Sequence, residues 1–225
     1  MPAGRRRYMS HLLLLGHRGA RATRSIPENT LASFDLALAQ GCDGFEFDVR
    51  QTADGRCVIC HDPDIQGVEI ARARNDELAN LSVLEQVLER YRGRAFLDIE
   101  IKVPGLENAV IQCLRTYPPQ RGYVLSSFLP DVLLQLHRLD ADLPLGLICE
   151  TMAQLACWKD LPVQFVIPHY TLTDINVCNA MHAAGRKLFT WTVNRQEQML
   201  RFKGMGADGI ISDETEMLGK LRAGS

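Results

Sequence analysis

The fold is decided by residues 44–49, which read GFEFDV. On a β-strand, Glu46 and Asp48 project to one side, while Phe45 and Phe47 project to the other. An aromatic face of this kind suits a strand whose outer side is covered by helices. The same strand therefore turns two carboxylates away from those helices.

The next apolar run repeats this pattern. Residues 97–102 read LDIEIK, so Asp98, Glu100 and Lys102 share one face and the apolar side chains share the other. Short apolar runs recur along the chain, at residues 12–15, 44–49, 95–101, 123–125, 145–148, 164–167, 187–192 and 209–211. Helix-periodic segments lie between them, the clearest at residues 30–40, 83–91, 131–139, 174–184 and 196–203. Eight strands alternating with helices predict the α/β fold class, as a (β/α)8 TIM barrel.

Local signals add detail to this prediction. Asn29 is expected to cap the helix at residues 30–40, and Gly41 to end it. Gly185 is expected to end the helix at residues 174–184 in the same way. A short extra β-arm is expected at residues 56–60, with a small insertion after the second strand.

Composition is typical of a globular enzyme rather than a nucleic-acid or membrane protein. The 225 residues contain no linker, so we expect one catalytic domain over residues 1–225, with residues 1–11 as a flexible or capping end. A formal net charge of -2 supplies no basic field, which excludes nucleic acid as a partner. The apolar run at residues 12–15 is far shorter than a signal peptide or a membrane helix, so no integral membrane segment is expected. Seven cysteines, an odd number without a spacing framework, favour a reducing compartment and a cytoplasmic location.

Acidic side chains gather at the ends of two neighbouring strands. Glu46, Asp48 and Glu100 all point into one mouth of the predicted barrel, where active sites of this fold are built. Carboxylates packed this closely repel one another, and a divalent cation relieves the repulsion. Oxygen ligands favour Mg²⁺ or Ca²⁺ over zinc, so we expect one such cation. The alternative is that Arg18 and Lys102 simply pair with these acids.

Two histidines also follow apolar strands. His17 adjoins Arg18, and His61 adjoins Asp62. Imidazole titrates near neutrality, so one histidine can take a proton from an attacking oxygen while the other protonates a leaving alkoxide. The alternative is that either histidine is a core or surface residue without a chemical role.

An ordered set of motifs resembles the glycerophosphodiester phosphodiesterase family. The set comprises GHRG at residues 16–19, PENT at 27–30, GFEFDV at 44–49, HDP at 61–63, IEIK at 99–102, SF at 127–128, WTVN at 191–194 and GADGIISD at 206–213. The resemblance implies a TIM barrel that hydrolyses glycerophosphodiesters, which are small-molecule substrates, to glycerol 3-phosphate and an alcohol with a divalent cation. It implies metal ligands at Glu46, Asp48 and Glu100, and an acid–base pair at His17 and His61. It further implies a phosphate clamp of Arg18 and Lys102, and pocket residues at Glu28 and Trp191.

The chain departs from the family pattern after His61 and Asp62, where the insertion looks short. Residues 63–79 are expected to overhang the mouth and to influence the choice of substrate. Two alternatives to the resemblance remain. One is a phospholipase C- or D-like phosphodiesterase that acts on lipid or lysolipid diesters, and the other is a non-catalytic barrel that binds metal or phosphate.

Overall fold

A closed barrel of parallel strands forms the centre of the molecule. The computed structural model describes residues 11–78 and 81–222. The barrel strands are β1 (Leu13–His17), β2 (Gly44–Gln51), β6 (Phe96–Ile101), β7 (Tyr123–Ser127), β8 (Leu145–Cys149), β9 (Phe165–Pro168), β10 (Lys187–Thr190) and β11 (Gly209–Ser212). Each pairs in parallel with its neighbours, and β1 pairs with both β2 and β11, which closes the ring. The predicted (β/α)8 barrel is confirmed.

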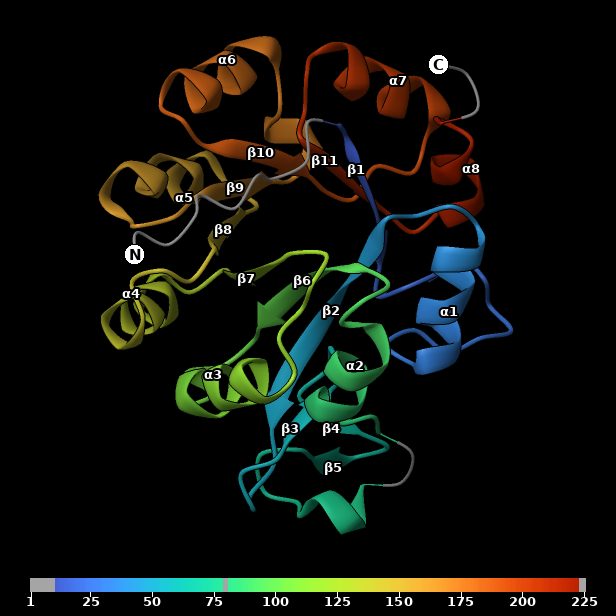
Figure 1. Cartoon of the computed structure of the whole chain (residues 1–225), viewed down its shortest axis with the longest axis vertical. Coiled ribbons are helices and arrows are strands. Elements are labelled where there is room, and N and C mark those ends of the chain that lie inside the picture. The colour runs from blue at the N-terminus through green and yellow to red at the C-terminus, as the bar shows by residue number, and fades with distance from the viewer. Residues whose placement is uncertain (1–10, 79–80, 223–225) are drawn as a thin grey trace.

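Helices surround this barrel, as Figure 1 shows. They are α1 (Leu31–Ala39), α2 (Leu84–Tyr91), α3 (Glu107–Thr116), α4 (Pro130–Leu139), α5 (Met152–Ala156), α6 (Ile175–Ala183), α7 (Gln196–Gly204) and α8 (Thr215–Gly219). Short 3-10 turns cover Asn75–Glu77, Cys157–Asp160 and Tyr170–Leu172. No helix among the described residues has the length and apolar character needed to cross a bilayer.

The aromatic face of β2 packs on the helices, as its sequence predicts. The ring of Phe45 stacks on that of Phe34 from α1, with centroids 4.1 Å apart, and meets the edge of Tyr91 from α2 at 4.9 Å. All three side chains are fully buried. This packing forces Glu46 and Asp48 to the inside of the barrel.

Aromatic rings close the bottom of the barrel interior. Phe96 and Phe165 begin their strands, and the ring of Phe189 lies 6.0 Å and 5.1 Å from theirs. A β-carbon at Gly209 would lie 2.5 Å from the Phe189 ring, so this position has room for glycine alone. The interior is therefore filled at the amino ends of the strands, and the polar groups lie at the carboxyl ends.

The predicted cap of α1 is wrong by one residue. Thr30 is the N-cap, because its hydroxyl accepts a hydrogen bond from the Ser33 amide (3.2 Å). Asn29 instead adopts a left-handed backbone (φ 57°) and turns its side chain toward Asp48. Gly41 and Gly185 do follow the last turns of α1 and α6, with φ of 95° and 69°, as predicted.

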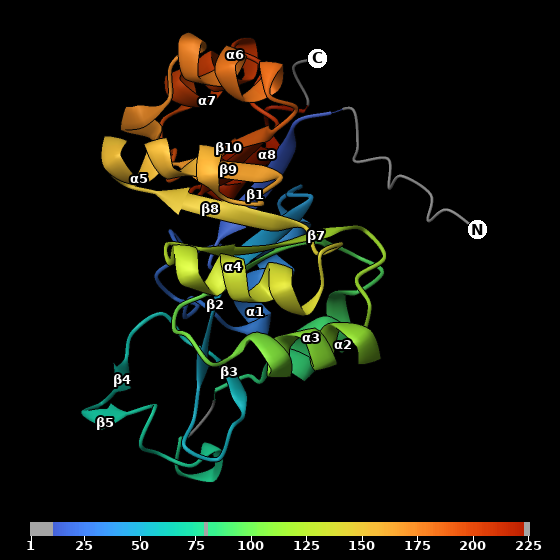
Figure 2. The ribbon, with the colours of Figure 1, turned by 90° about the vertical axis from the view of Figure 1, so that its left-hand side faces the viewer.

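A side arm lies outside the barrel. It consists of β3 (Cys57–Ile59), which pairs antiparallel with β2, and of the two-residue strands β4 (Asp64–Ile65) and β5 (Val68–Glu69). Figure 2 shows β4 and β5 projecting to one side of the molecule. Ile70, Ala73 and Leu78 pack with the outer face of β3 in a small apolar cluster of their own, which draws the segment after β5 away from the barrel axis.

Two predictions concern cysteines and the amino end. All seven cysteines are free, and Cys57 and Cys60 are buried. The predicted flexible or capping end at residues 1–11 lies outside the described residues apart from His11.

Candidate functional site

Strand register brings the predicted site residues together. His17 on β1 is the register partner of Glu46 on β2, and Asp48 on β2 is the partner of Glu100 on β6. All are buried. Their strands end at a cavity of about 280 Å³, which is lined by His17, Arg18, Glu46, His61, Asp98, Glu100, Lys102, Phe128, Ile148, Glu150, Ile167, Trp191 and Ile211. Most of the residues predicted from sequence therefore meet in one place.

Glu46, Asp48 and Glu100 form a compact acidic triad. One carboxylate oxygen from each lies within 4.8 Å of those of the other two. Burial and the neighbouring acids raise the pKa of Glu46 well above its ordinary value, and burial together with Asp48 raises the pKa of Glu100 to about 7. Burial acts on Asp48 as well, but Lys102 and Arg18 outweigh it and hold the pKa of Asp48 below its usual range.

Arg18 and Lys102 do pair with these acids, but they do not balance them. Lys102 Nζ lies 2.8 Å from a Glu100 oxygen and 3.3 Å from Asp48 Oδ1, and Arg18 Nε lies 3.3 Å from Asp48 Oδ2. With Asp98, four carboxylates meet two fixed cations at this end of β2 and β6. When all four are ionised, they carry two more charges than the two cations, which is the amount that one divalent cation neutralises.

The buried oxygens also suit a cation chemically. Asp98 Oδ2 is buried and accepts no hydrogen bond in the described part of the chain, and Asp48 Oδ1 is buried with Lys102 Nζ at 3.3 Å as its ion-pair partner. Ser126 Oγ donates to the other oxygen of Asp98 (2.5 Å), and burial raises the pKa of Asp98 to about 7. A buried carboxylate oxygen without a donor is costly unless a cation or water satisfies it. The triad and its neighbour Asp98 thus supply the charge and the oxygen donors of an oxygen-ligand metal site.

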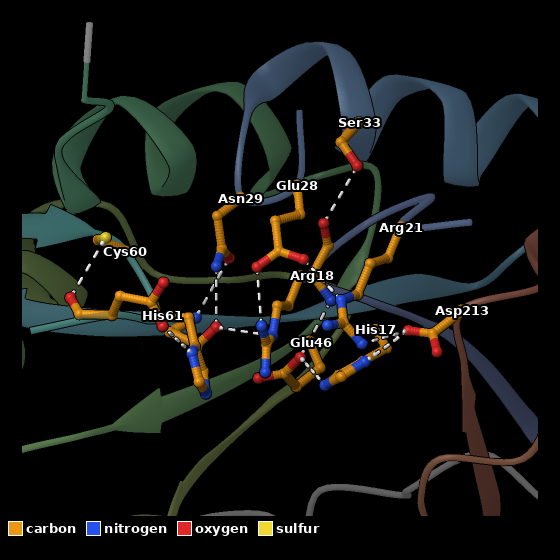
Figure 3. A network of polar contacts seen from close by, with 12 residues as sticks. His17, Arg18, Arg21, Glu28, Asn29, Ser33, Glu46, Cys60, His61 and Asp213 are labelled. Atoms are coloured by element: carbon orange, nitrogen blue, oxygen red, sulfur yellow. Dashed lines mark hydrogen bonds and ion pairs between the residues drawn. The ribbon is translucent and has the colours of Figure 1, made fainter. Parts of the chain in front are cut away.

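His17 is oriented by a carboxylate from the far end of the chain. Its Nδ1 lies 2.7 Å from Asp213 Oδ1, and its Nε2 lies 3.8 Å from Glu46 (Figure 3). Burial lowers the pKa of His17, although Asp213 acts in the opposite direction. Burial tends to raise the pKa of Asp213, but His17, Asn194 and Arg21 together hold it at about 2. A neutral His17 with Nδ1–H bonded to Asp213 leaves Nε2 as a proton acceptor on the cavity side.

Asn194 fixes Asp213 in turn. Its Nδ2 donates to Asp213 Oδ2 (2.7 Å), and its Oδ1 accepts from the Asp213 amide (2.9 Å). Neither residue was among the predicted site residues. In the sequence, both residues follow predicted strands, which indicates that they lie at the mouth of the barrel. The sequence does not show that Asn194 contacts Asp213 or that Asp213 contacts His17.

His61 reaches the same cavity from the end of β3. Its Nδ1 lies 2.8 Å from Asp62 Oδ1, and its carbonyl accepts from Arg50 Nε (2.8 Å). Its side chain is 35% exposed, whereas that of His17 is 9% exposed. Both histidines therefore line the cavity with Nδ1 next to an aspartate, and His17 is the more buried of the two.

Glu28 and Asn29 act behind the cavity rather than in its wall. Glu28 Oε1 accepts from Arg18 Nη1 (2.7 Å), and its Oε2 accepts from Arg21 Nε (2.6 Å). Asn29 Nδ2 donates to Asp48 Oδ2 (2.8 Å). The predicted pocket residue Glu28 lies outside the cavity lining and holds Arg18 in place (Figure 3).

Trp191 does line the cavity, as part of an apolar wall. Its Nε1 donates to the carbonyl of Ile167 (3.0 Å), and its ring meets Phe128 edge-on at 5.6 Å. None of residues 63–78 lines the cavity, and the overhang expected of residues 63–79 stays a prediction, with residue 79 outside the described part of the chain.

Comparison with known proteins decides the family. The sequence model of the glycerophosphoryl diester phosphodiesterase family matches residues 17–110 and 105–217, which together span most of the chain. The chain belongs to this family. It is accordingly an enzyme, a glycerophosphodiester phosphodiesterase, as the motif resemblance implies.

Relatives of this phosphodiesterase are similar over nearly their whole length. The glycerophosphodiester phosphodiesterase of Caldanaerobacter subterraneus subsp. tengcongensis is 29% identical, over 92% of this chain and 96% of its own. The crystal structure of the enzyme from Thermotoga maritima superimposes with a TM-score of 0.82 at 26% identity, covering 96% of this chain and all of that one. A phosphodiesterase from Oleispira antarctica, solved in complex with the product sn-glycerol-3-phosphate, gives 0.83 at 25% identity, covering 94% and 96%.

Proposed function

We propose that this phosphodiesterase hydrolyses glycerophosphodiesters to glycerol 3-phosphate and an alcohol, with a divalent cation and a pair of histidines. The observation that carries the proposal is one cavity lined by Glu46 and Glu100 of the acidic triad, by two cationic side chains and by two imidazoles, with Asp48 completing the triad beside it. The product named for the Oleispira antarctica relative supports the same substrate class.

One Mg²⁺ or Ca²⁺ would be held by Glu46, Asp48 and Glu100. When bound, the cation supplies a Lewis acid that polarises a phosphoryl oxygen. The carboxylates of this triad are close enough to share one ion, and their mutual repulsion is the driving force for binding it.

Arg18 and Lys102 would form the phosphate clamp. Both line the cavity beside the triad. Glu28 holds Arg18 from outside the cavity lining, and Glu100 and Asp48 of the triad hold Lys102, so both charges are fixed in position. Charge grows on the non-bridging oxygens as the phosphoryl group is attacked, and preorganised cations stabilise it.

His17 and His61 would move the protons. One imidazole Nε2 takes the proton of the attacking hydroxyl, which belongs to water or to the neighbouring glycerol hydroxyl. As the bond from phosphorus to the leaving oxygen breaks, the other imidazole, protonated beforehand, gives its proton to that oxygen. A cyclic phosphate formed by glycerol attack is then opened by water, so either route consumes one water molecule.

Product identity tests this proposal. Purified protein is incubated with glycerophosphocholine, glycerophosphoethanolamine and glycerophosphoglycerol in the presence of Mg²⁺ or Ca²⁺. We expect glycerol 3-phosphate and the free alcohol. Release of glycerol and a phosphorylated alcohol would show cleavage of the other ester bond and contradict the proposal, as would no turnover on any diester.

One observation favours a second candidate, hydrolysis of lysolipid diesters. Leu129, at the start of α4, is 37% exposed, and Met152, at the start of α5, is 63% exposed. Leu129 directly follows Phe128, an apolar residue of the cavity lining, and Met152 lies two residues after Glu150, so exposed apolar side chains lie close in sequence to the lining. Faster turnover of lysophosphatidylcholine than of glycerophosphocholine, reversed by Met152→Ser, would establish this candidate.

We also propose that the chain works as one catalytic domain in the cytoplasm. The strands and helices of the barrel draw on sequence from residue 13 to residue 219. The free cysteines agree with a reducing compartment.

A further inference from the structure

The wall of the cavity is divided between two arcs of the barrel. Its reactive lining comes from the arc of β1, β2 and β6, together with His61 after β3. The opposite arc, β7 to β11, contributes a lining of Phe128, Ile148, Ile167, Trp191 and Ile211. One side therefore carries the chemistry, and the other offers apolar contact to a part of the substrate that does not react.

Glu150 breaks the apolar character of this second arc. It follows β8 directly and lines the cavity. The other described lining residues on the arc from β7 to β11 are apolar or aromatic, so Glu150 supplies the charge on that side. Its amide donates to Gln154 Oε1 (2.8 Å), which fixes the backbone at the entry to α5. Its side chain is exposed at the cavity rim, and none of the ion pairs among the described residues includes it. An acid at the end of an apolar wall, with no cation from the chain itself, is free to meet a cation of the substrate.

Aromatic rings in the same wall are held in fixed orientations. Besides its bond to the Ile167 carbonyl, Trp191 lies edge-to-face with both Phe128 and His169, at 5.6 Å and 5.3 Å. Ring faces bind ammonium groups through their quadrupole, and the attraction is strongest where water is excluded. The carboxylate of Glu150 adds a negative charge, which attracts the positive ammonium group.

The two arcs meet at Phe128, next to the phosphate clamp. Lys102 Nζ lies 5.9 Å from the centre of the Phe128 ring. A phosphate held by Lys102 and Arg18 would thus be adjacent to the apolar wall, in the same cavity that Glu150 lines.

We propose that Trp191, Phe128 and Glu150 form a subsite for a cationic alcohol, so that the preferred substrates are diesters of amino alcohols, quaternary ones included. This inference rests on the proposed function and narrows its substrate class. A neutral polyol would leave Glu150 without a partner and would not use the ring faces.

The test compares two diesters that differ in charge alone. One is glycerophosphocholine, and the other carries the carbon isostere of choline, in which a tert-butyl group replaces the trimethylammonium group. We expect kcat/KM to favour the choline diester about tenfold. Glu150→Gln should remove most of this preference by lowering kcat/KM for the cationic diester, with the neutral one nearly unchanged. Glu89→Gln, an exposed residue on α2 away from the cavity, removes the same charge and should leave the preference intact.

A binding measurement separates failure of the subsite from failure of the proposed function. Trp158→Phe leaves Trp191 as the single tryptophan, whose fluorescence is followed during titration with choline or its uncharged isostere. We expect choline to bind more tightly, and Glu150→Gln to abolish the difference. Equal response to both ligands, or equal loss of both activities in Glu150→Gln, would overturn the subsite. Selective choline binding without diester hydrolysis would uphold the subsite and contradict the function.

Discussion

His17 Nδ1 and Asp213 Oδ1 lie 2.7 Å apart, although 196 positions separate the two residues along the chain. The contact exists because β1 and β11 are neighbours in the closed barrel, where Gly16 is the register partner of Ser212. It determines which imidazole nitrogen faces the cavity. The ring can accept a proton at Nε2 as long as Asp213 accepts the hydrogen bond from Nδ1–H.

Asp213→Asn should therefore lower kcat much more than it changes KM. The asparagine amide can donate to Nδ1 and so favour the unreactive tautomer, and a comparable change in a hydrolase triad shows that such losses reach about 10⁴. We expect a loss of about 10²-fold or more in kcat, measured under saturating substrate. Asn194→Ala, which removes only the support of Asp213, should give a smaller loss. A wild-type kcat in Asp213→Asn would show that this contact is structural.

Each cavity histidine should be required for turnover. His17→Ala and His61→Ala are expected to lower kcat by about 10²–10⁴-fold, the range for loss of a general acid or base. Their melting temperatures should stay close to that of the wild type. The control is His137→Ala on α4, outside the barrel, which should retain full activity. Survival of activity in either cavity variant would exclude that histidine from the mechanism.

Glu46→Gln should weaken cation binding. The change keeps the shape of the side chain and removes one charge from the triad, and even partners outside the ligand shell alter metal affinity by about 10–100-fold. Calorimetric titration with Mg²⁺ or Ca²⁺ should show a loss of at least tenfold. Unchanged affinity would remove Glu46 from the proposed ligand set.

Asp208 should contribute stability that depends on pH. Its carboxylate oxygens form hydrogen bonds with Lys187 Nζ, His182 Nε2 and the Leu188 amide, each at 2.9 Å. Burial opposes this, but the three donors hold the pKa of Asp208 below its ordinary value. A carboxyl whose folded-state pKa is depressed stabilises the fold above its unfolded pKa of about 4, and this contribution is lost as pH falls below that value.

Asp208→Asn measures this contribution. We expect the free energy of unfolding to fall by about 1–2 kcal/mol at pH 7, as for a hydrogen-bonded charge. The difference from the wild type should shrink between pH 5 and pH 3 in urea titrations. A difference that stays constant with pH would mean that the charge of Asp208 is irrelevant.

The acidic triad was predictable from sequence because it depends on two simple rules. Alternation along a strand places Glu46 and Asp48 on one face, and parallel pairing of neighbouring strands then sets Asp48 beside Glu100. Both rules act on the backbone, so the side chains follow with little freedom. The same reasoning placed Phe45 and Phe47 against the helices.

Contacts that depend on local backbone or on loop packing were not predictable in this way. Asn29 and Thr30 are both good capping residues, and the left-handed backbone at Asn29 gives the cap to its neighbour. Glu28 belongs to a motif next to site residues in the sequence, but its carboxylate pairs with Arg18 and Arg21 and does not line the cavity. The arm after His61 follows an apolar cluster on β3 whose members show no periodic pattern.

The central claim is cation-dependent hydrolysis at the triad, and activity after chelation tests it most directly. Protein treated with a chelator and then freed of it is assayed for release of glycerol 3-phosphate from glycerophosphocholine. We predict no release of glycerol 3-phosphate until a cation is added back, and full recovery of activity with at least one of Mg²⁺ and Ca²⁺. Undiminished release from the chelated protein would contradict the account.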